Sequence, residues 1–312
     1  MLAGIDIGGT KCAVILGTED GQIVKKVKFP TTSREDAMRQ IFDSLDLIND
    51  FDAIGIPCGG PLDSKNGIIL NPPNLKGWEN YPIVKILKDR YHVPCYLCND
   101  ANAGALAEWQ FGAGKGCNNM AFLTFGTGLG AGLILDGHLY SGTNDMAGEI
   151  GHIRIAPDGP EGYYKNGSFE GFCSGAGMKK IGITLMREEL WKGNTMPYCK
   201  CEADLEKIDA KIISEYARKG DPLCLKVFEI TGTKLGEGLA ILVDILNLEK
   251  IVIGSLFARE EKLFRPLMES ALEREALQLS RSVVEVVPAQ LGESIGDIAA
   301  ITLAKIAKEQ NL

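Results

Sequence analysis

Apolar runs and short polar turns alternate at the start of the chain. Residues 2–29 read as three short strands joined at Gly8-Gly9 and Asp20-Gly21, and the second dipeptide is typical of two-residue hairpins. In chain order the pattern then predicts a helix from about Ser33 to Asn49, a strand over Phe51–Pro57, a loop over Cys58–Tyr81, a helix, a strand ending near Cys98, and a helix from Asp100 to about Phe111. This half is predicted to be an α/β domain.

The second half begins in the same way. Residues 119–142 predict a strand, a glycine turn at Gly126–Gly128, a second strand and a hairpin turn at Asp136-Gly137. In chain order there follow helices over about 204–218 and 221–247, a strand KIVIGS, a helix from Glu260, a strand SVVEVVPA and a helix from Ser294 to Ala307. The shared element order indicates a duplicated α/β domain, with two unrelated α/β domains as the alternative.

The length of 312 residues also favours two domains, because a single hydrophobic core rarely grows this large. We place a small N-terminal α/β domain at residues 1–114 and a larger C-terminal α/β domain at residues 115–294. The C-terminal helix, residues 295–312, is expected to pack on the small domain.

Net charge and apolar run lengths exclude several classes of function. A net charge of -8 argues against binding along a phosphate backbone, so we expect no nucleic-acid partner. The longest apolar run, Met120–Leu135, is shorter than the ~20 residues of a membrane-spanning helix and contains four glycines. The N-terminus has no basic segment before its first apolar run, so we expect a cytoplasmic protein without a signal peptide. The nine scattered cysteines indicate reduced thiols.

Each half opens with a strand, a glycine-rich turn and a strand. Such turns let backbone amides approach an anion, and two of them suit a polyphosphate between the domains. In DIGGTK, Asp6 beside a phosphate would be repulsive without Mg²⁺ between them, through water, while Lys11 supplies a positive charge. The plain alternative is a pair of tight hairpins. Gly126-x-Gly128-x-x-Ala131 also fits a dinucleotide fingerprint, but a strand follows where that motif needs a helix.

The segment CNDANAGALAEWQ places Asn99 and Asp100 where a strand ends and a helix begins. Ligands collect at the carboxyl ends of strands in α/β folds, so Asp100 can accept a hydroxyl proton during phosphoryl transfer while Asn99 orients the substrate. The alternative is a helix N-cap. Further on, Glu149, His152 and Glu170 allow a metal site, an acid/base pair or a clamp for an uncharged ligand.

Four blocks together resemble the ROK family of sugar kinases and sugar-responsive repressors, within the hexokinase/actin-like superfamily. The blocks are DIGGTK, NDANA, GTGLGAGLILDGHLYSG and AGEIGH, in the order of the family. The C-terminal IVIGS resembles the adenosine-contacting turn of the family, although the usual second glycine is Ser255 here. The resemblance implies two ribonuclease-H-like, actin-like ATPase domains with a cleft between them, which close on MgATP and a sugar.

The resemblance also implies a role for each matched residue. Asp100 is the catalytic base in that reading. The sugar hydroxyls are held by Gly60, Asn74, Asn99, Asp100, Glu149, His152 and Glu170, and the nucleotide by Asp6, Gly8, Gly9, Thr10, Lys11, Gly126, Thr127, Gly128 and Gly254. This makes the group around Glu149 a clamp for neutral hydroxyls rather than a metal site.

One family feature is missing from the chain. Most ROK members carry C-x-C-G-x-x-G-C-x-E, whose cysteines bind a structural zinc ion, but those positions here are Gly162, Tyr164 and Ser168. We therefore expect no zinc, although a relocated site built from Cys173, Cys199 or Cys201 is an alternative. The main expectation is that Tyr163, Tyr164 and Phe169 pack the loop by aromatic burial.

The sequence as a whole predicts an ATP- and Mg²⁺-dependent hexose kinase, glucokinase-like, with transfer to the 6-hydroxyl. Alternatives are a kinase for N-acetylmannosamine, fructose, allose or mannose, and a sugar-sensing homologue of the repressors that does not bind DNA. We expect a homo-oligomer, a dimer or tetramer, without a membrane partner. The sequence leaves open the sugar, the number of subunits and any phosphoryl donor besides ATP.

Overall fold

The computed structural model describes residues 1–312, which form two compact units. Unit 1 comprises Met1–Asn118, Gly132–Gly148 and Gln290–Leu312, and unit 2 comprises Asn119–Ala131 and Glu149–Ala289. Gly132–Gly148 thus belongs to unit 1, whereas the sequence boundaries put it in the second domain. Two contacts explain this: Ser64 donates its hydroxyl and backbone N–H to the Asp145 carboxylate, at 2.7 and 2.8 Å.

Unit 1 is built on a five-stranded sheet with the order β3-β2-β1-β4-β7. The first three strands are antiparallel, and β1, β4 and β7 run parallel. Its elements are β1 (Leu2–Ile7), β2 (Lys11–Gly17), β3 (Ile23–Pro30), α1 (Arg34–Ile48), β4 (Ile54–Cys58), β5 (Leu62–Asp63), β6 (Ile68–Ile69), α2 (Ile83–Tyr91), β7 (Cys95–Asn99), α3 (Asp100–Phe111), β10 (His138–Leu139), η3 (Gly292–Ser294) and α10 (Ile295–Gln310).

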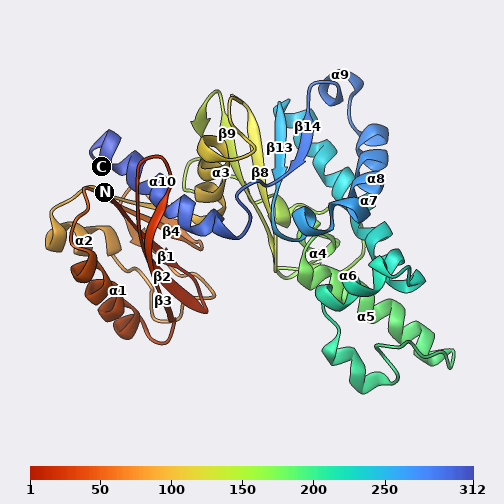
Figure 1. Cartoon of the computed structure of the whole chain (residues 1–312). Helices are drawn as coiled ribbons and strands as arrows, with labels where there is room; N and C mark the ends of the chain where they lie inside the picture. Colours follow the sequence, from red (N-terminus) through yellow and green to blue (C-terminus); the bar gives the residue numbers. More distant parts are fainter. The chain divides into compact units, whose positions relative to one another are not determined.

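Alternating side chains of the strands feed two cores. Ile5 and Ile7 of β1 belong to a core shared with α1 and α2, whereas Leu2 belongs to a core with α10. Helices α1 and α2 lie on one face of the sheet and α10 on the other (Figure 1). Ala300 and Ile301 of α10 are fully buried there. Residues more than 280 positions apart in the sequence therefore share one core, which places the C-terminal helix in unit 1.

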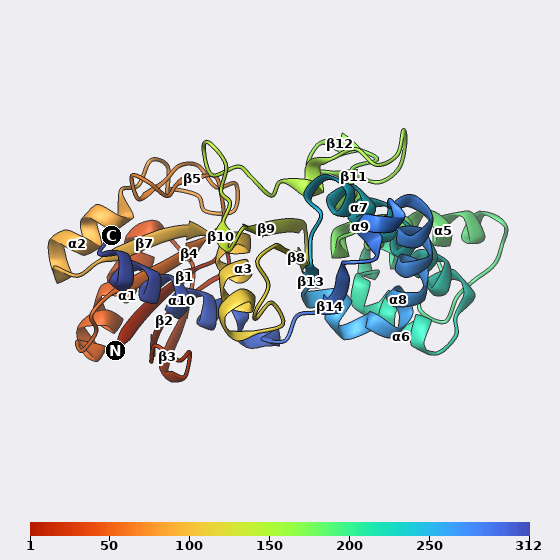
Figure 2. The same ribbon diagram turned by 90° about the horizontal axis from the view of Figure 1, so that it is seen from above.

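Unit 2 carries most of a second five-stranded sheet, with the order β10-β9-β8-β13-β14. Strand β9 crosses the boundary between the units along the chain. The remaining elements are β8 (Met120–Phe125), β9 (Leu129–Leu135), η1 (Ile150–His152), β11 (Glu161–Gly162), β12 (Lys165–Asn166), α4 (Phe169–Phe172), α5 (Gly175–Trp191), η2 (Glu202–Lys207), α6 (Ala210–Arg218), α7 (Pro222–Leu246), β13 (Lys250–Ile253), α8 (Ser255–Glu275), α9 (Gln278–Arg281) and β14 (Glu285–Pro288). Helices α7 and α8 lie side by side (Figure 2).

The two sheets have the same strand order relative to their chain order. In each, the third, second and first strands of the half stand next to one another, and two further strands follow the first. The last three strands of each sheet run parallel. This repeated topology agrees with the duplicated α/β domain that the sequence predicts.

The helices depart from the sequence prediction at several points. Helix α5 was not predicted, and the first part of the helix expected over about 204–218 is the 3₁₀ segment η2, so that α6 begins at Ala210. Helix α8 begins at Ser255 rather than Glu260, and Glu260 has non-helical backbone angles that mark a kink. The buried Leu256 and Phe257, ahead of the predicted start, already belong to the helix. None of the helices is both long and apolar enough to cross a bilayer.

Candidate functional site

The first glycine turn joins β1 to β2 at the carboxyl end of β1. The Gly8 amide donates to the Lys11 carbonyl at 3.1 Å, which closes the turn. Thr31 fixes it from the side, because its hydroxyl donates to the Gly8 carbonyl at 2.6 Å. Gly9, Thr10 and Lys11 are exposed at the tip. The turn is therefore held rigidly by its own strands while its tip stays accessible.

Two loops of unit 1 approach this turn and the end of β7. A side chain at Gly9 would come within 2.7 Å of the Asn74 carbonyl oxygen, so only glycine allows the Asn74 loop to lie there. The Asn99 side-chain nitrogen lies close to Gly60, 3.3 Å from where a Cβ atom would stand. The sequence-predicted residues Gly60, Asn74 and Asn99 are thus brought next to the turn or to the end of β7.

Asn99 and Asp100 stand at the junction of β7 and α3. Asn99 is the N-cap: its Oδ1 accepts from the amides of Ala101 and Asn102, at 3.0 and 3.3 Å. These bonds fix the side chain and turn its Nδ2 toward Gly60. Asp100 Oδ1 accepts from the Ala101 amide at 2.8 Å. The N-cap role is therefore real for Asn99, and it leaves Asp100 as the first residue of the helix.

The Asp100 carboxyl group is accessible at the surface yet crowded by protein atoms. This desolvation raises its pKa, and the bond from the Ala101 amide only partly offsets the rise. A carboxylate with a raised pKa is a stronger proton acceptor than an ordinary aspartate, which is the property that a general base needs.

Asp6 is the next-to-last residue of β1 and lies beside the same turn. The pKa of Asp6 is raised, chiefly by desolvation and further by the nearby Asp297 carboxylate. The positive charge of Lys26 lowers this pKa and offsets part of the rise. Lys26 and Asp297 form an ion pair. Two carboxylates in one half-buried place suit a bound cation, because a positive charge would relieve their repulsion.

The pairing of Lys26 with Asp297 was missed by the sequence analysis. The two residues are 271 positions apart, on β3 and on α10. Neither lies in a motif, and only the packing of α10 on the first sheet brings them to Asp6. No local pattern in the sequence signals such a contact.

The second glycine turn, Gly126–Gly128, joins β8 to β9 in unit 2. The Gly126 amide donates to the Gly128 carbonyl at 3.1 Å, and the Gly126 carbonyl accepts from the Gly175 amide at 2.8 Å. Thr127 is exposed at the tip. As in the first turn, the backbone is tied down from behind and the tip stays accessible.

Glu170 lies directly against this second turn. Its Oε2 accepts from the Leu129 amide at 3.0 Å. A Cβ atom at Gly128 would stand only 2.6 Å from the same oxygen, so the absence of a side chain there lets the carboxylate reach the strand. Glu170 is thus positioned by one of its two carboxylate oxygens.

Gly254 and Ser255 follow β13 in unit 2. The Gly254 amide donates to the Leu123 carbonyl at 2.9 Å and Gly254 is buried. Ser255, which stands where the family usually has a second glycine, has φ +53°. This left-handed conformation explains why glycine is usual at that position. The turn keeps the glycine geometry although its second residue has a side chain.

Glu149 and His152 flank a single 3₁₀ turn. The His152 amide donates to the Glu149 carbonyl at 3.2 Å, and residues three apart in such a turn face the same side. Both side chains are exposed. The Lys165 ammonium donates to the His152 carbonyl at 2.7 Å and ties the turn to β12.

The expected aromatic packing of the loop between His152 and Glu170 is wrong for its two tyrosines and confirmed for Phe169. Tyr163 and Tyr164 are 63% and 90% exposed, and only Phe169, at 1%, is buried. The two tyrosines form the tip of a two-residue hairpin between β11 and β12, and a tip side chain has no core beneath it.

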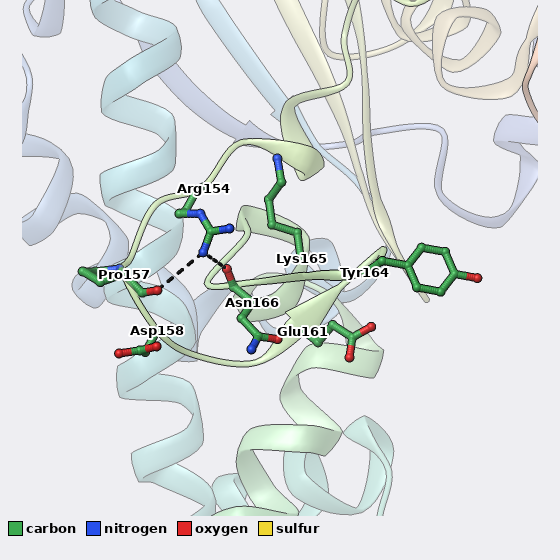
Figure 3. Close-up of a pocket in the computed structure, with 7 residues that line it drawn as sticks. All are labelled: Arg154, Pro157, Asp158, Glu161, Tyr164, Lys165 and Asn166. Carbon is green, nitrogen blue, oxygen red and sulfur yellow. Dashed lines mark hydrogen bonds between the residues drawn. The ribbon is translucent and has the colours of Figure 1, made fainter.

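Hydrogen bonds hold this loop. Ser168 donates its hydroxyl to the Gly162 carbonyl at 3.3 Å and accepts from the Gly171 amide at 3.1 Å. Arg154 donates to the Asn166 carbonyl at 2.8 Å and to the Pro157 carbonyl at 3.5 Å (Figure 3). Ile155 and Ala156 both donate their amides to the Gly167 carbonyl. Ser168 stands at one of the three positions where most of the family has cysteines, and its side chain forms hydrogen bonds there.

The same loop surrounds an open, shallow cavity of about 480 Å³. Its lining is formed by Arg154, Pro157, Asp158, Glu161, Tyr164, Lys165 and Asn166 (Figure 3). Arg154 crosses it, whereas the Tyr164 ring points away from the loop. The cavity carries charges of both signs and has no deep floor.

The cysteines proposed as a relocated metal set do not come together. Cys173 is buried and donates to the Thr231 carbonyl at 3.5 Å, while the Cys201 thiol donates to Asp204 at 3.6 Å. The Cys199 thiol donates to the Cys201 carbonyl at 3.7 Å. No group of three or more His, Cys, Asp and Glu side chains in the chain has an arrangement that would hold a metal ion.

Comparisons with known proteins agree with this geometry. A model of the ROK family matches residues 2–307. The chain is 33% identical over 312 residues to a glucokinase of Thermotoga maritima, with 97% of each protein covered. It is also 28% identical to the DNA-binding transcriptional dual regulator NagC of Escherichia coli, over 97% of this chain and 75% of that protein.

A solved structure extends the similarity to three dimensions. A ROK family glucokinase from Streptomyces griseus, in complex with glucose and AMPPNP, superposes with a TM-score of 0.78 at 30% identity, and the match covers 98% of this chain and 99% of that one. The family match spans nearly the whole chain, and the two sheets repeat one topology. The chain belongs to the ROK family and has the actin-like ATPase fold of its sugar kinases.

Proposed function

We propose that the protein transfers the γ-phosphoryl group of ATP to a hydroxyl of a hexose, and that the 6-hydroxyl of glucose is the acceptor. The observation that carries the proposal is the placement of Asp100. Its desolvated carboxyl group stands at the carboxyl end of β7, the edge strand that pairs in parallel with β4, in the same unit as a glycine turn with an aspartate beside it. A proton acceptor near a phosphate cradle is the arrangement that a phosphoryl transfer to an alcohol requires.

Asp100 is the general base in this proposal. As the sugar oxygen attacks the γ-phosphorus, the hydroxyl proton passes to the free carboxylate oxygen of Asp100, and ADP leaves. Asn99 assists with its Nδ2 group, which is free to donate to a hydroxyl because its Oδ1 is occupied as the N-cap. The charges that develop on the phosphoryl group need donors, and backbone amides of the glycine turns supply them.

The nucleotide is assigned to the two glycine turns and Gly254. Gly9 and Thr10 in unit 1 and Thr127 and Gly128 in unit 2 offer amides and hydroxyls to the phosphates, and Lys11 adds a positive charge. Gly8 and Gly126 close the two turns with their own amides and let the backbone come close to the phosphates. Gly254 offers backbone without a side chain to the adenosine. Asp6, through water, would hold the Mg²⁺ that neutralises phosphate charge when bound, which suits its shared carboxylate environment.

The neutral hydroxyls of the sugar are assigned to hydrogen-bonding side chains and backbone groups, among them two carboxylates. In unit 2, Glu149 and His152 face one side of their 3₁₀ turn, and Glu170 is positioned by one of its oxygens. In unit 1, Gly60, Asn74 and Asn99 complete the set. We propose that these groups read the hydroxyl pattern of one hexose.

Two alternatives share the same family. The first alternative is another sugar: mannose and allose are epimers of glucose at one carbon, N-acetylmannosamine is mannose with an acetamido group at C2, and fructose is the 2-keto isomer. A sugar-sensing homologue without catalysis is disfavoured by the retention of Asp100 beside an intact first glycine turn. The net charge of -8 also disfavours DNA.

The test is sugar-dependent release of ADP. We expect a coupled assay with ATP and Mg²⁺ to show saturable ADP formation with glucose and lower kcat/KM values with the other four sugars. A different sugar in first place would change the substrate but keep the kinase. ADP release that does not depend on any of the five sugars would refute the proposal.

A further inference from the structure

The hairpin between β11 and β12 has an unusual tip. Two residues, Tyr163 and Tyr164, connect strands of two residues each. Their φ angles are +43° and +63°, so both central residues are in the left-handed region. This is the geometry of a type I′ turn, which strongly favours Asn and Gly because a bulky side chain is strained there.

Burial of the aromatic rings does not compensate for this strain. Tyr163 is 63% exposed and Tyr164 is 90% exposed, so neither ring contributes much to the core. Strained, exposed aromatic residues are retained in proteins mainly where a function needs them. These observations indicate that the tyrosines at the tip have a role other than stabilising their own loop.

The ring of Tyr163 lies at the candidate sugar clamp. It meets the His152 imidazole edge to face, with 6.0 Å between ring centroids. Its other neighbour is the Tyr164 ring at 5.5 Å, and Figure 3 shows Tyr164 directed away from the loop. Tyr163 thus adjoins the clamp, whereas Tyr164 lies one residue further out.

The base of the hairpin is anchored to the same turn as His152. Lys165 donates to the His152 carbonyl at 2.7 Å, and Arg154 donates to the Asn166 carbonyl at 2.8 Å. These bonds fix the hairpin relative to the imidazole. The position of the Tyr163 ring beside His152 is therefore built into unit 2 before any ligand binds.

We propose that Tyr163 is a further sugar-binding residue, which covers an apolar C–H face of the sugar that His152 holds by hydrogen bonds. The inference rests on the proposed function, since it assigns the second wall of the same site. A hexose presents hydroxyls around its rim and C–H groups on its faces, so a clamp of polar groups binds it better with an aromatic ring against one face.

The role is one of binding and not of chemistry. The Tyr163 ring carries no proton in the proposed reaction and contributes equally to ground-state and transition-state binding. Loss of the ring is therefore expected to raise KM and leave kcat within about twofold.

Glycine substitutions separate this role from a structural one. Tyr163→Gly relieves the positive φ, so the melting temperature should stay equal or rise, while KM and the Kd for glucose rise about tenfold. Tyr164→Gly is the matched control: it relieves the same kind of strain one residue further from His152 and should change both constants less than about threefold. Tyr163→Phe should keep the wild-type KM, because it keeps the ring.

Two results would contradict a sugar-binding role of Tyr163. An unchanged Kd in Tyr163→Gly would overturn it, and so would an equal loss in both glycine variants, because the loop conformation would then be responsible. If Tyr163→Gly does not fold, Tyr163→Asn, which tolerates the same φ, takes its place. Calorimetric glucose binding is measured without ATP, so a wild-type protein that binds glucose but does not phosphorylate it would refute the kinase assignment and leave the Tyr163 result readable.

Discussion

The carboxyl group of Asp100 lies where its charge is useful to the reaction and unfavourable for the fold. Desolvation raises its pKa, so the folded chain binds a proton there at a pH where the unfolded chain has already lost it. Folding stability from this group is greatest below the unfolded pKa near 3.8 and falls as the pH rises through the folded pKa. At neutral pH the ionised group costs stability, which a neutral side chain would recover.

Asp100→Asn tests both sides of this balance. We expect kcat to fall by about 10³-fold, because the proton acceptor is lost, while the Kd for glucose changes less than about threefold. The melting temperature at pH 7 should not fall below that of the wild type. Wild-type activity should also decrease on acidification through the raised pKa, because the base must be ionised. Near-normal turnover in the variant would rule out Asp100 as the base.

At the scale of elements, the short helix α4 carries Glu170 and depends on Ser168. This side chain is completely buried, caps α4 through the Gly171 amide and also bonds the Gly162 carbonyl. It joins the hairpin to the helix at a position where most family members have a cysteine. The geometry of Glu170 therefore rests on a hydroxyl and not on a thiolate.

Ser168→Ala should reduce the free energy of unfolding by about 2 kcal/mol, because a cap and a buried hydrogen bond are lost together. It should also raise the KM for the sugar several-fold, since Glu170 is less well held. Ser33→Ala is the control: it removes the N-cap of α1, where Ser33 accepts from the Asp36 amide, and should cost about 1 kcal/mol without changing KM. Equal KM effects in the two variants would contradict this role of Ser168.

How far the sequence predicted an element depended on whether its signal was local. Ser33 and Asn49 bound α1 as predicted, and Asp100 begins α3, because capping residues and apolar periodicity act within a few positions. The glycine turns were found for the same reason. The hairpin tip was misjudged: aromatic residues suggested burial, whereas the backbone turn between β11 and β12 pushes Tyr163 and Tyr164 outward. The Lys26–Asp297 pair near Asp6 had no local signal at all.

At the scale of the whole molecule, we expect the activity of the protein to depend on Mg²⁺ and not on zinc. The loop that carries Glu170 is closed by backbone and serine hydrogen bonds, so a chelator selective for zinc should leave kcat and the melting temperature unchanged. EDTA should abolish turnover, and Mg²⁺ alone should restore it. Activity that returns only after zinc is added would show that the loop has a metal that this arrangement does not explain.

The central claim is that this ROK chain phosphorylates a hexose at its 6-hydroxyl. The most direct measurement is to incubate the wild-type protein with ATP, Mg²⁺ and glucose and to identify the products by phosphorus NMR. We expect glucose 6-phosphate and ADP in equal amounts with wild-type protein, and their formation about 10³-fold more slowly with Asp100→Asn. The contrary result is release of inorganic phosphate from ATP with no sugar phosphate formed, whether glucose or any of the four related sugars is supplied.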